Sequence, residues 1–218
     1  NIGMKFGIWY EPEMVSPDSD LFRAHPDWYL HVPGRPGSLG RSQYVLDMSR
    51  DDVVDNIWEQ MNALLSKHTV DYVKWDFNRN LTEVGSAILP ADRQKEVYHR
   101  YVLGVYKLMN RLVTTYPDLL LENCSGGGGR FDPAMLYYFP QIWTSDNSDA
   151  YMRTFIQYGT SLCYPLSAQS CHVSASPNHQ CGRITPFESR AAIAHLGATG
   201  YELDTTKLNE NELSKIKK

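Results

Sequence analysis

The sequence has no run of basic residues, no long apolar stretch and few cysteines, and each absence excludes a class of protein. Lys and Arg number 21 against 25 Asp and Glu, and the net charge of −4 argues against nucleic-acid binding, which depends on clustered cations. No apolar run approaches the roughly 20 residues that a helix needs to cross a bilayer. The first residues, Asn-Ile-Gly-Met, are neither a signal peptide nor a natural start. We therefore expect a piece of a longer protein that binds neither membranes nor nucleic acids.

The cysteines form no recognisable zinc pattern and are too few for a disulfide scaffold in a chain of 218 residues. They are Cys124, Cys163, Cys171 and Cys181. His172 and His179 lie near the last two, but an adjacent Cys and His cannot easily present both side chains to one ion. We expect no metal site, and we interpret the cysteines as reduced thiols of a cytoplasmic protein.

Short apolar runs alternate with helical patterns along the chain, which predicts a parallel sheet with helices outside it. Strands are expected at residues 5–10, 44–47, 70–76, 118–123, 141–146, 162–167 and 199–203. Helices are expected at residues 51–66, 91–115, 149–158 and 186–196, with Ser49 capping the first and Thr185, before Pro186, capping the last. Seven strands are too many for a small doubly wound sheet and one short of a (β/α)8 TIM barrel. The first strand is followed by no Gly-x-Gly-x-x-Gly, which weakens a dinucleotide-binding alternative.

Polar residues gather where the expected strands end. In a barrel the carboxyl ends of the strands form the active site, so chemistry is expected at these positions. Loops are polar wherever they begin, but that does not explain acidic residues at the ends of so many strands. The positions are Glu11, Glu13, Asp47, Lys74, Asp76, Asn123, Cys124 and Asp146.

Lys74 and Asp76 are two positions apart on an expected strand, so their side chains share a face. An ammonium group beside a carboxylate favours the ionised carboxylate. An ionised, oriented carboxylate is what a glycosidase nucleophile requires. A structural ion pair at a strand end is the commoner alternative.

A second carboxylate follows the strand expected at residues 141–146. Asp149 stands where the next helix needs an N-cap, which leaves Asp146 for catalysis. Two carboxylates from different strands, a few ångströms apart, supply a nucleophile and an acid/base. The four glycines after Ser125 lack the Lys-Ser or Lys-Thr of a P-loop, and they would let the backbone approach a ligand closely.

Taken together, these stretches resemble glycoside hydrolase family 36, the bacterial α-galactosidases or melibiases that act on α-1,6-linked galactose. Each stretch alone is modest, but they recur in the family's order and cover nearly the whole chain. They are KFGIWYEPEMV (5–15), YVLD (44–47), KWDFNR (74–79), ENCSGGGGR (122–130), WTSDN (143–147), HVS with PNHQ (172–174 and 177–180) and GYELD (200–204).

The resemblance implies a retaining double displacement, with Asp76 at the nucleophile position and Asp146 at the acid/base position. Arg41 and Lys74 would donate to hydroxyls of a terminal α-linked galactose, as in melibiose or raffinose, and Trp9 would form an apolar wall. The implied sugar-binding residues are Trp9, Arg41, Lys74, Asn78, Cys124, Gly126 and Trp143. The resemblance implies no metal or organic cofactor, and we expect the full-length parent to be a homo-oligomer.

The resemblance also defines what the chain lacks. Family members carry a barrel strand before residues 5–10, which ends in two aspartates that hold galactose, and they have β domains on both sides of the barrel. We therefore expect residues 1–218 to be a catalytic barrel domain without its first strand and most of its last helix. Three alternatives stay open: a raffinose-synthase-type galactosyl transferase, an α-N-acetylgalactosaminidase, and a silent carbohydrate-binding domain. Asp76 and Asp146 together argue against the last.

Overall fold

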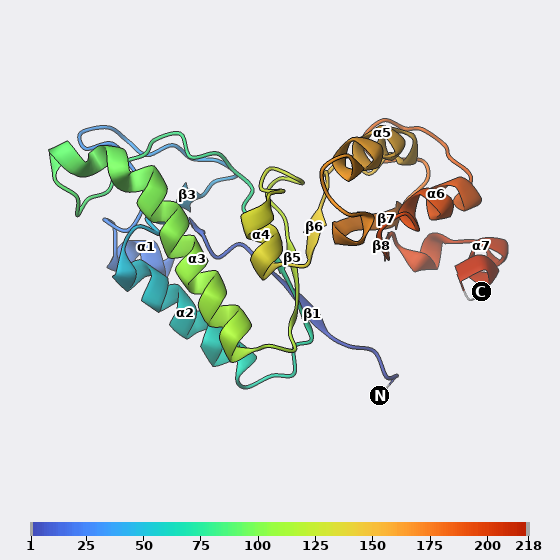
Figure 1. Cartoon of the computed structure of the whole chain (residues 1–218), viewed down its shortest axis with the longest axis horizontal. Coiled ribbons are helices and arrows are strands. Elements are labelled where there is room, and N and C mark those ends of the chain that lie inside the picture. Colours follow the sequence, from blue (N-terminus) through green and yellow to red (C-terminus); the bar gives the residue numbers. More distant parts are fainter. Residues whose placement is uncertain (1, 217–218) are drawn as a thin grey trace. The chain divides into compact units, whose positions relative to one another are not determined.

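The structure, a computed structural model, describes residues 2–216 and consists of two compact units that divide between Leu121 and Glu122 (Figure 1). Both units alternate strands with helices, as the sequence predicts. Strand β5 (Leu120–Asn123) carries the chain from the first unit into the second.

The first unit contains a parallel strand pair and a separate antiparallel pair. Its elements are β1 (Gly7–Tyr10), β2 (Met14–Val15), α1 (Asp20–Ala24), β3 (Tyr44–Val45), α2 (Asp51–Leu65), β4 (Tyr72–Trp75), the 3-10 helix η1 (Ala91–Glu96) and α3 (Val97–Thr115). Strand β1 runs parallel to β4 with Trp9 opposite Lys74. Strands β2 and β3 pair antiparallel in a sheet of their own.

The core of this unit lies along helices α2 and α3, which pack against each other (Figure 1). Their apolar residues recur at three- and four-residue spacing, so each helix presents one buried face. The buried residues include Val54, Ile57 and Met61 on α2 and Val105, Leu108 and Leu112 on α3. Each such side chain contributes about 1.5–3 kcal/mol on burial. Gly104 allows helix α3 to approach the backbone at Met48 closely, because a Cβ at position 104 would lie 1.7 Å from the Met48 carbonyl oxygen.

In the second unit the parallel strands follow one another in chain order. Its elements are the end of β5, α4 (Pro133–Tyr138), β6 (Gln141–Trp143), α5 (Ala150–Ser161), the 3-10 helix η2 (Leu166–Ala168), β7 (Gln169–Ser174), α6 (Phe187–Ala194), β8 (Ala198–Glu202), the 3-10 helix η3 (Thr205–Lys207) and α7 (Glu210–Ile216). Strand β6 lies between β5 and β7, and β8 pairs with β7 from Ser170 opposite Ala198 to Ser174 opposite Glu202.

One of the expected strands is wrong, and another is shorter than expected and lies in a different sheet. Residues 162–167 form a turn that leads into η2, and Leu162 and Leu166 are exposed. The strand follows as β7, whose polar residues are buried and therefore gave no apolar signal. Of residues 44–47 only Tyr44–Val45 is a strand, and its antiparallel partner β2 excludes it from the parallel set.

The expected helices are present, with differences at their starts. Arg50 occupies the N-cap of α2, while the Ser49 hydroxyl donates to Asp47. Pro186 occupies the N-cap of α6 in place of Thr185. The helix expected at residues 91–115 begins as the 3-10 segment η1. The expected cap at Asp149 is confirmed, because its side chain accepts a hydrogen bond from the Met152 amide.

Candidate active site

The expected site residues fall into two groups, one in each unit. In the first unit, Asp76 directly follows β4, and its amide donates to the carbonyl of Tyr10 at 2.8 Å. Its buried carboxylate accepts three hydrogen bonds. The Phe77 amide donates to Oδ1 at 2.8 Å, and Oδ2 accepts from Trp9 Nε1 at 3.2 Å and from Asn78 Nδ2 at 2.5 Å. Both oxygens are thereby fixed in orientation.

Glu11 extends this network to Arg41. Its Oε1 accepts from Arg41 Nη1 at 2.8 Å and from Asn78 Nδ2 at 2.6 Å. The structure thus brings four of the expected site residues, Trp9, Arg41, Asp76 and Asn78, into one hydrogen-bonded network. Glu11 joins them, although the sequence marked it only as an acid at a strand end. The sequence signal that could have assigned Glu11 to the site is its two-residue spacing from Trp9, since alternate strand positions share a face.

Lys74 belongs to the same unit. It lies on β4, two residues before Asp76 and directly opposite Trp9 on β1. Its side chain is partly buried. The strand pairing therefore sets Trp9 and Lys74 at one level of the sheet, next to the strand end that carries the Asp76 carboxylate.

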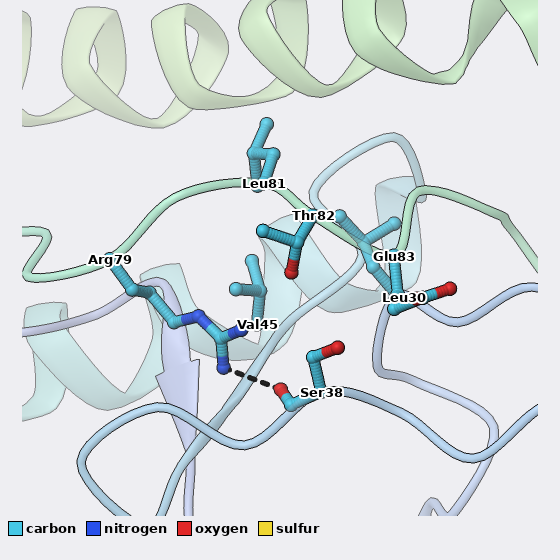
Figure 2. A pocket seen from close by; sticks show the side chains of 7 residues that line it. All are labelled: Leu30, Ser38, Val45, Arg79, Leu81, Thr82 and Glu83. Carbon is cyan, nitrogen blue, oxygen red and sulfur yellow. Dashed lines mark hydrogen bonds between the residues drawn. The ribbon is translucent and has the colours of Figure 1, made fainter.

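Arg79 anchors the loop that carries Arg41 (Figure 2). Its Nη1 donates to the carbonyls of Ser38 and Gln43, each at 2.7 Å, at the two sides of Arg41 in the chain. Burial lowers the pKa of the Arg79 guanidinium below its usual value, but an arginine remains charged. Arg41 and Ser42 have φ of 53° and 61°, in the left-handed region that non-glycine residues rarely adopt. Such strain persists only where surrounding contacts enforce it.

In the second unit, Asp146 follows β6 and is exposed, in contrast to the buried Asp76. Trp143 Nε1 donates to its Oδ1 at 3.1 Å. Gln180 Nε2 donates to its backbone carbonyl at 2.9 Å, and the Gln180 side-chain oxygen accepts from the Ser148 amide. Trp143 and Asp146, both expected site residues, therefore lie in contact.

Arg153 holds the backbone on both sides of Asp146. From α5 it donates to the carbonyls of Ser145 at 2.5 Å and Asn147 at 2.7 Å, and also to the Thr144 hydroxyl. Its guanidinium carbon lies 4.1 Å from the centre of the Trp143 ring. Burial lowers the pKa of Arg153, whose side chain has no role in the expectations drawn from the sequence. Nothing local in the sequence marks it, because its partners are mostly backbone carbonyls.

The glycine loop, residues 125–129, packs against the same segment. A Cβ on Gly127 would lie 2.8 Å from the Asp146 amide nitrogen, and one on Gly128 would lie 2.5 Å from the Thr144 carbonyl oxygen. Gly126 and Gly127 also have φ of 53° and 83°. The loop therefore requires glycine for contact with the Asp146 backbone. Cys124, immediately before it, is buried.

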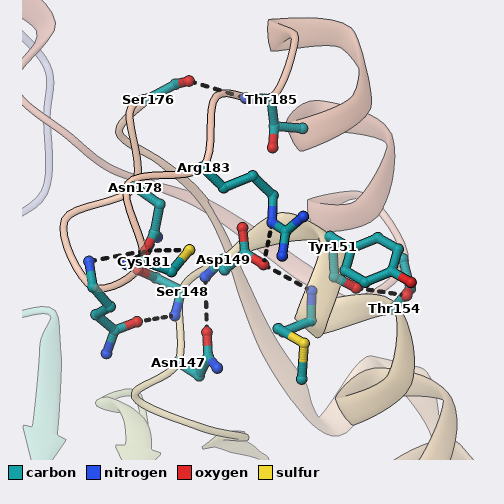
Figure 3. Close-up of polar contacts among 12 residues, drawn as sticks. Asn147, Ser148, Asp149, Tyr151, Thr154, Ser176, Asn178, Cys181, Arg183 and Thr185 are labelled. Carbon is teal, nitrogen blue, oxygen red and sulfur yellow. Dashed lines mark hydrogen bonds and ion pairs between the residues drawn. The ribbon is translucent and has the colours of Figure 1, made fainter.

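Asp149 has a structural role, as the sequence predicts (Figure 3). Its Oδ2 accepts from the Met152 amide at 3.2 Å and from Arg183 Nε at 3.1 Å. Ser148, beside it, is bound by Asn178, whose Nδ2 donates to the Ser148 hydroxyl at 3.1 Å. These contacts hold residues 178–183 against the start of α5.

Neither a metal cluster nor a membrane span is found in the described residues. Across residues 2–216, His, Cys, Asp and Glu form no group of three or more that could hold an ion. Over the same residues no helix is both long and apolar enough to cross a bilayer.

Comparison with known proteins assigns the whole chain to one group. The family model described as Melibiase matches residues 1–218. Alpha-galactosidase AgaA of Geobacillus stearothermophilus and Alpha-galactosidase Mel36A of Lactobacillus acidophilus are each 57% identical over 216 residues, which are 99% of this chain and 30% of theirs. The chain therefore spans about 30% of the length of these curated relatives.

Solved structures give the same result. A variant of AgaA in complex with raffinose has a TM-score of 0.97 and 57% identity, covering 99% of this chain and 30% of that one. TtGalA from Thermus thermophilus, at 22% identity and a TM-score of 0.65, shares the fold. The expected fold is confirmed: the chain forms part of a (β/α)8 barrel.

Proposed function

Because the chain belongs to the melibiase family, we propose that it is the catalytic part of a retaining α-galactosidase, with Asp76 as nucleophile and Asp146 as acid/base. The carrying observation is the Asp76 carboxylate, which is buried and held by three hydrogen bonds at the end of a barrel strand. Such a carboxylate is pre-oriented, so little reorganisation precedes its attack on a sugar carbon.

In this mechanism Asp76 attacks the anomeric carbon and forms a covalent galactosyl ester, while Asp146 donates a proton to the departing oxygen. Asp146 then takes a proton from water, which hydrolyses the ester with net retention. The different surroundings of the two residues support these roles. The nucleophile is buried and fixed, whereas the acid/base is exposed and can exchange its proton with solvent.

Two structures of AgaA variants support this pair. One variant, in complex with stachyose, has an aspartate replaced by alanine; the other, in complex with raffinose, has an aspartate replaced by asparagine. The two replaced aspartates are 70 positions apart in that enzyme, and Asp76 and Asp146 are 70 positions apart here (146 − 76). Replacement of catalytic carboxylates is a way to keep a substrate intact in a complex.

We extend the proposal to a terminal α-1,6-linked galactose as substrate, since the relatives' complexes contain raffinose and stachyose. The sugar-binding residues that we propose are Trp9, Arg41, Lys74 and Asn78 in the first unit, and Cys124, Gly126 and Trp143 in the second. We also propose a homo-oligomeric, cytoplasmic enzyme, which light scattering and cell fractionation would test.

The alternatives fit less well. Curated relatives named α-galactosidases match the chain at 55–57% identity, which does not favour a transferase or an α-N-acetylgalactosaminidase. The resemblance places the glycine loop near the 2-hydroxyl of the sugar, where an α-N-acetylgalactosaminidase needs room for an acetamido group, and in the second unit this loop packs tightly on residues 144–146. A silent binding domain would need neither carboxylate.

The test uses the protein as its gene encodes it, with p-nitrophenyl α-galactoside and NMR observation of the first sugar released. We expect α-galactose to appear first and to mutarotate later. Release of β-galactose would overturn the retaining mechanism, and no hydrolysis of any α-galactoside would overturn the proposed activity.

A further inference from the structure

We propose that Glu11 is a positioning residue, which holds Asn78 and Arg41 in place and through Asn78 orients Asp76. This inference rests on the proposed function and extends it to a residue that touches no expected sugar atom. The Glu11 side chain is only 8% exposed, and a single oxygen, Oε1, accepts from both Asn78 and Arg41.

The amide of Asn78 bridges two carboxylates. Its Nδ2 carries two hydrogens and donates to two carboxylates, Glu11 Oε1 at 2.6 Å and Asp76 Oδ2 at 2.5 Å. The reversed amide would direct an oxygen acceptor at two carboxylate oxygens, which cannot donate when ionised. Glu11 thus selects the Asn78 orientation in which a donor faces Asp76.

Two carboxylates bridged by one neutral amide would repel each other, because like charges at short range are destabilising. Arg41 offsets this repulsion by donating to Glu11 at 2.8 Å. The Arg41 side chain is 54% exposed, so Arg41 can hold Glu11 through one nitrogen and still present other donors to solvent.

Arg41 reaches Glu11 from a loop that Arg79 fixes through the carbonyls of Ser38 and Gln43. Figure 2 shows the contact with Ser38. Asn78 and Arg79 are adjacent in the chain, so the segment after β4 holds both the nucleophile and this loop. Glu11 links the two through its hydrogen bonds with Asn78 in that segment and Arg41 in the loop.

The experiment compares four variants of the protein as its gene encodes it: Glu11→Gln, Glu11→Ala, Asn78→Ala and the double variant Glu11→Ala with Asn78→Ala. We expect Glu11→Ala to lower kcat/KM on p-nitrophenyl α-galactoside on the order of 100-fold, as expected for misplaced catalytic groups. Glu11→Gln keeps an oxygen acceptor, so it should retain about tenfold more activity than Glu11→Ala. The double variant should lose little more than the worse single variant, because both changes remove one shared contact.

Asp55→Asn is the matched control. It also changes an acid to an amide and breaks an ion pair in the first unit, with Arg111 at 2.6 Å between α2 and α3. We expect its kcat/KM to stay within about twofold of wild type, as for a surface ion pair. Melting curves of all variants identify any that are unfolded. If Glu11→Ala is unfolded, Glu11→Gln takes its place, and a further double variant, Glu11→Gln with Asn78→Ala, replaces the first one in the comparison of kcat/KM.

The positioning role is overturned if Glu11→Ala keeps kcat/KM within threefold of wild type, or if the losses of the two single variants multiply in the double variant. These outcomes differ from failure of the proposed function. An inactive wild type, or an Asp76→Ala variant with undiminished activity, would overturn that function itself.

Discussion

Trp9 and Asp76 are joined by a hydrogen bond of 3.2 Å from the indole Nε1 to the carboxylate Oδ2. The parallel pairing of β1 with β4 produces this contact, because it sets Trp9 opposite Lys74, two residues before Asp76. Trp9 is 50% exposed while Asp76 is buried. The Trp9 side chain therefore offers an open apolar surface, which suits sugar binding. Through its N–H it also orients the Asp76 carboxylate, which suits nucleophilic attack.

Asp76→Ala tests the nucleophile. Without its carboxylate no glycosyl ester can form, so kcat should fall on the order of 10⁴-fold or more. Added azide should restore part of the turnover by entering the vacated space and yield β-galactosyl azide, which NMR identifies. A variant with near-normal turnover and no azide product would remove Asp76 from this role.

Asp146→Ala tests the acid/base. Protonation of the departing oxygen contributes about 10²–10⁴-fold, and it matters most for poor leaving groups. We expect a much larger loss on melibiose than on an activated aryl galactoside. Asp149→Ala is the neighbouring control. It removes an N-cap worth about 1 kcal/mol together with the Arg183 ion pair, so it should lower stability without this substrate dependence. Equal losses of Asp146→Ala on both substrates would contradict the assignment.

The helices could be predicted from the sequence because apolar spacing and capping residues are local. The expected helix at residues 51–66 and the cap at Asp149 follow from such signals, and the structure has both. Strand β7 (Gln169–Ser174) could not be predicted in this way. It buries polar residues such as Ser174, whose hydroxyl donates to the Ser148 carbonyl, so its stability depends on contacts far along the chain.

The candidate site shows the same division. Trp9, Lys74 and Asp76 lie at the ends of apolar strands, where polarity and two-residue spacing are visible in the sequence. The importance of Glu11 was not visible, because its partner Arg41 is 30 positions away on a loop that backbone carbonyls and Arg79 hold in place. Contacts to backbone carbonyls leave no pattern of residue types.

Arg153→Lys tests whether the Arg153 contacts position Asp146. Lysine cannot reproduce the planar fork that binds the carbonyls of Ser145 and Asn147, so we expect a destabilisation of about 1.5–3 kcal/mol. Activity should fall more on melibiose than on the aryl galactoside, as for Asp146→Ala. Denaturant unfolding and kinetics on both substrates measure the two effects.

Arg190→Lys is the matched control for that variant. Arg190 is also buried in the second unit and donates to the carbonyls of Ser174 and Thr185, away from Asp146. Arg190→Lys should destabilise the protein by a similar amount but leave the ratio of its activities on melibiose and the aryl galactoside unchanged. An equal change of that ratio in both variants would mean that Arg153 acts through general stability.

Gly127→Ala tests the packing of the glycine loop on Asp146. Alanine at φ of 83° is strained by about 1–2 kcal/mol, and its Cβ would lie 2.8 Å from the Asp146 amide nitrogen, so that backbone must shift. Gly34→Ala separates the two causes. Gly34 has φ of 79°, but nothing lies within 4 Å of the added Cβ, so it carries only the conformational strain. Gly127→Ala should therefore lose more stability than Gly34→Ala, because the clash adds to the conformational strain. Only Gly127→Ala should lower kcat on melibiose, on the order of 10- to 100-fold, because about 1 Å of displacement suffices for such a loss. If Gly127→Ala retains the kcat of Gly34→Ala on melibiose, the loop does not fix the acid/base, and the position of Asp146 depends instead on its contacts with Trp143, Arg153 and Gln180.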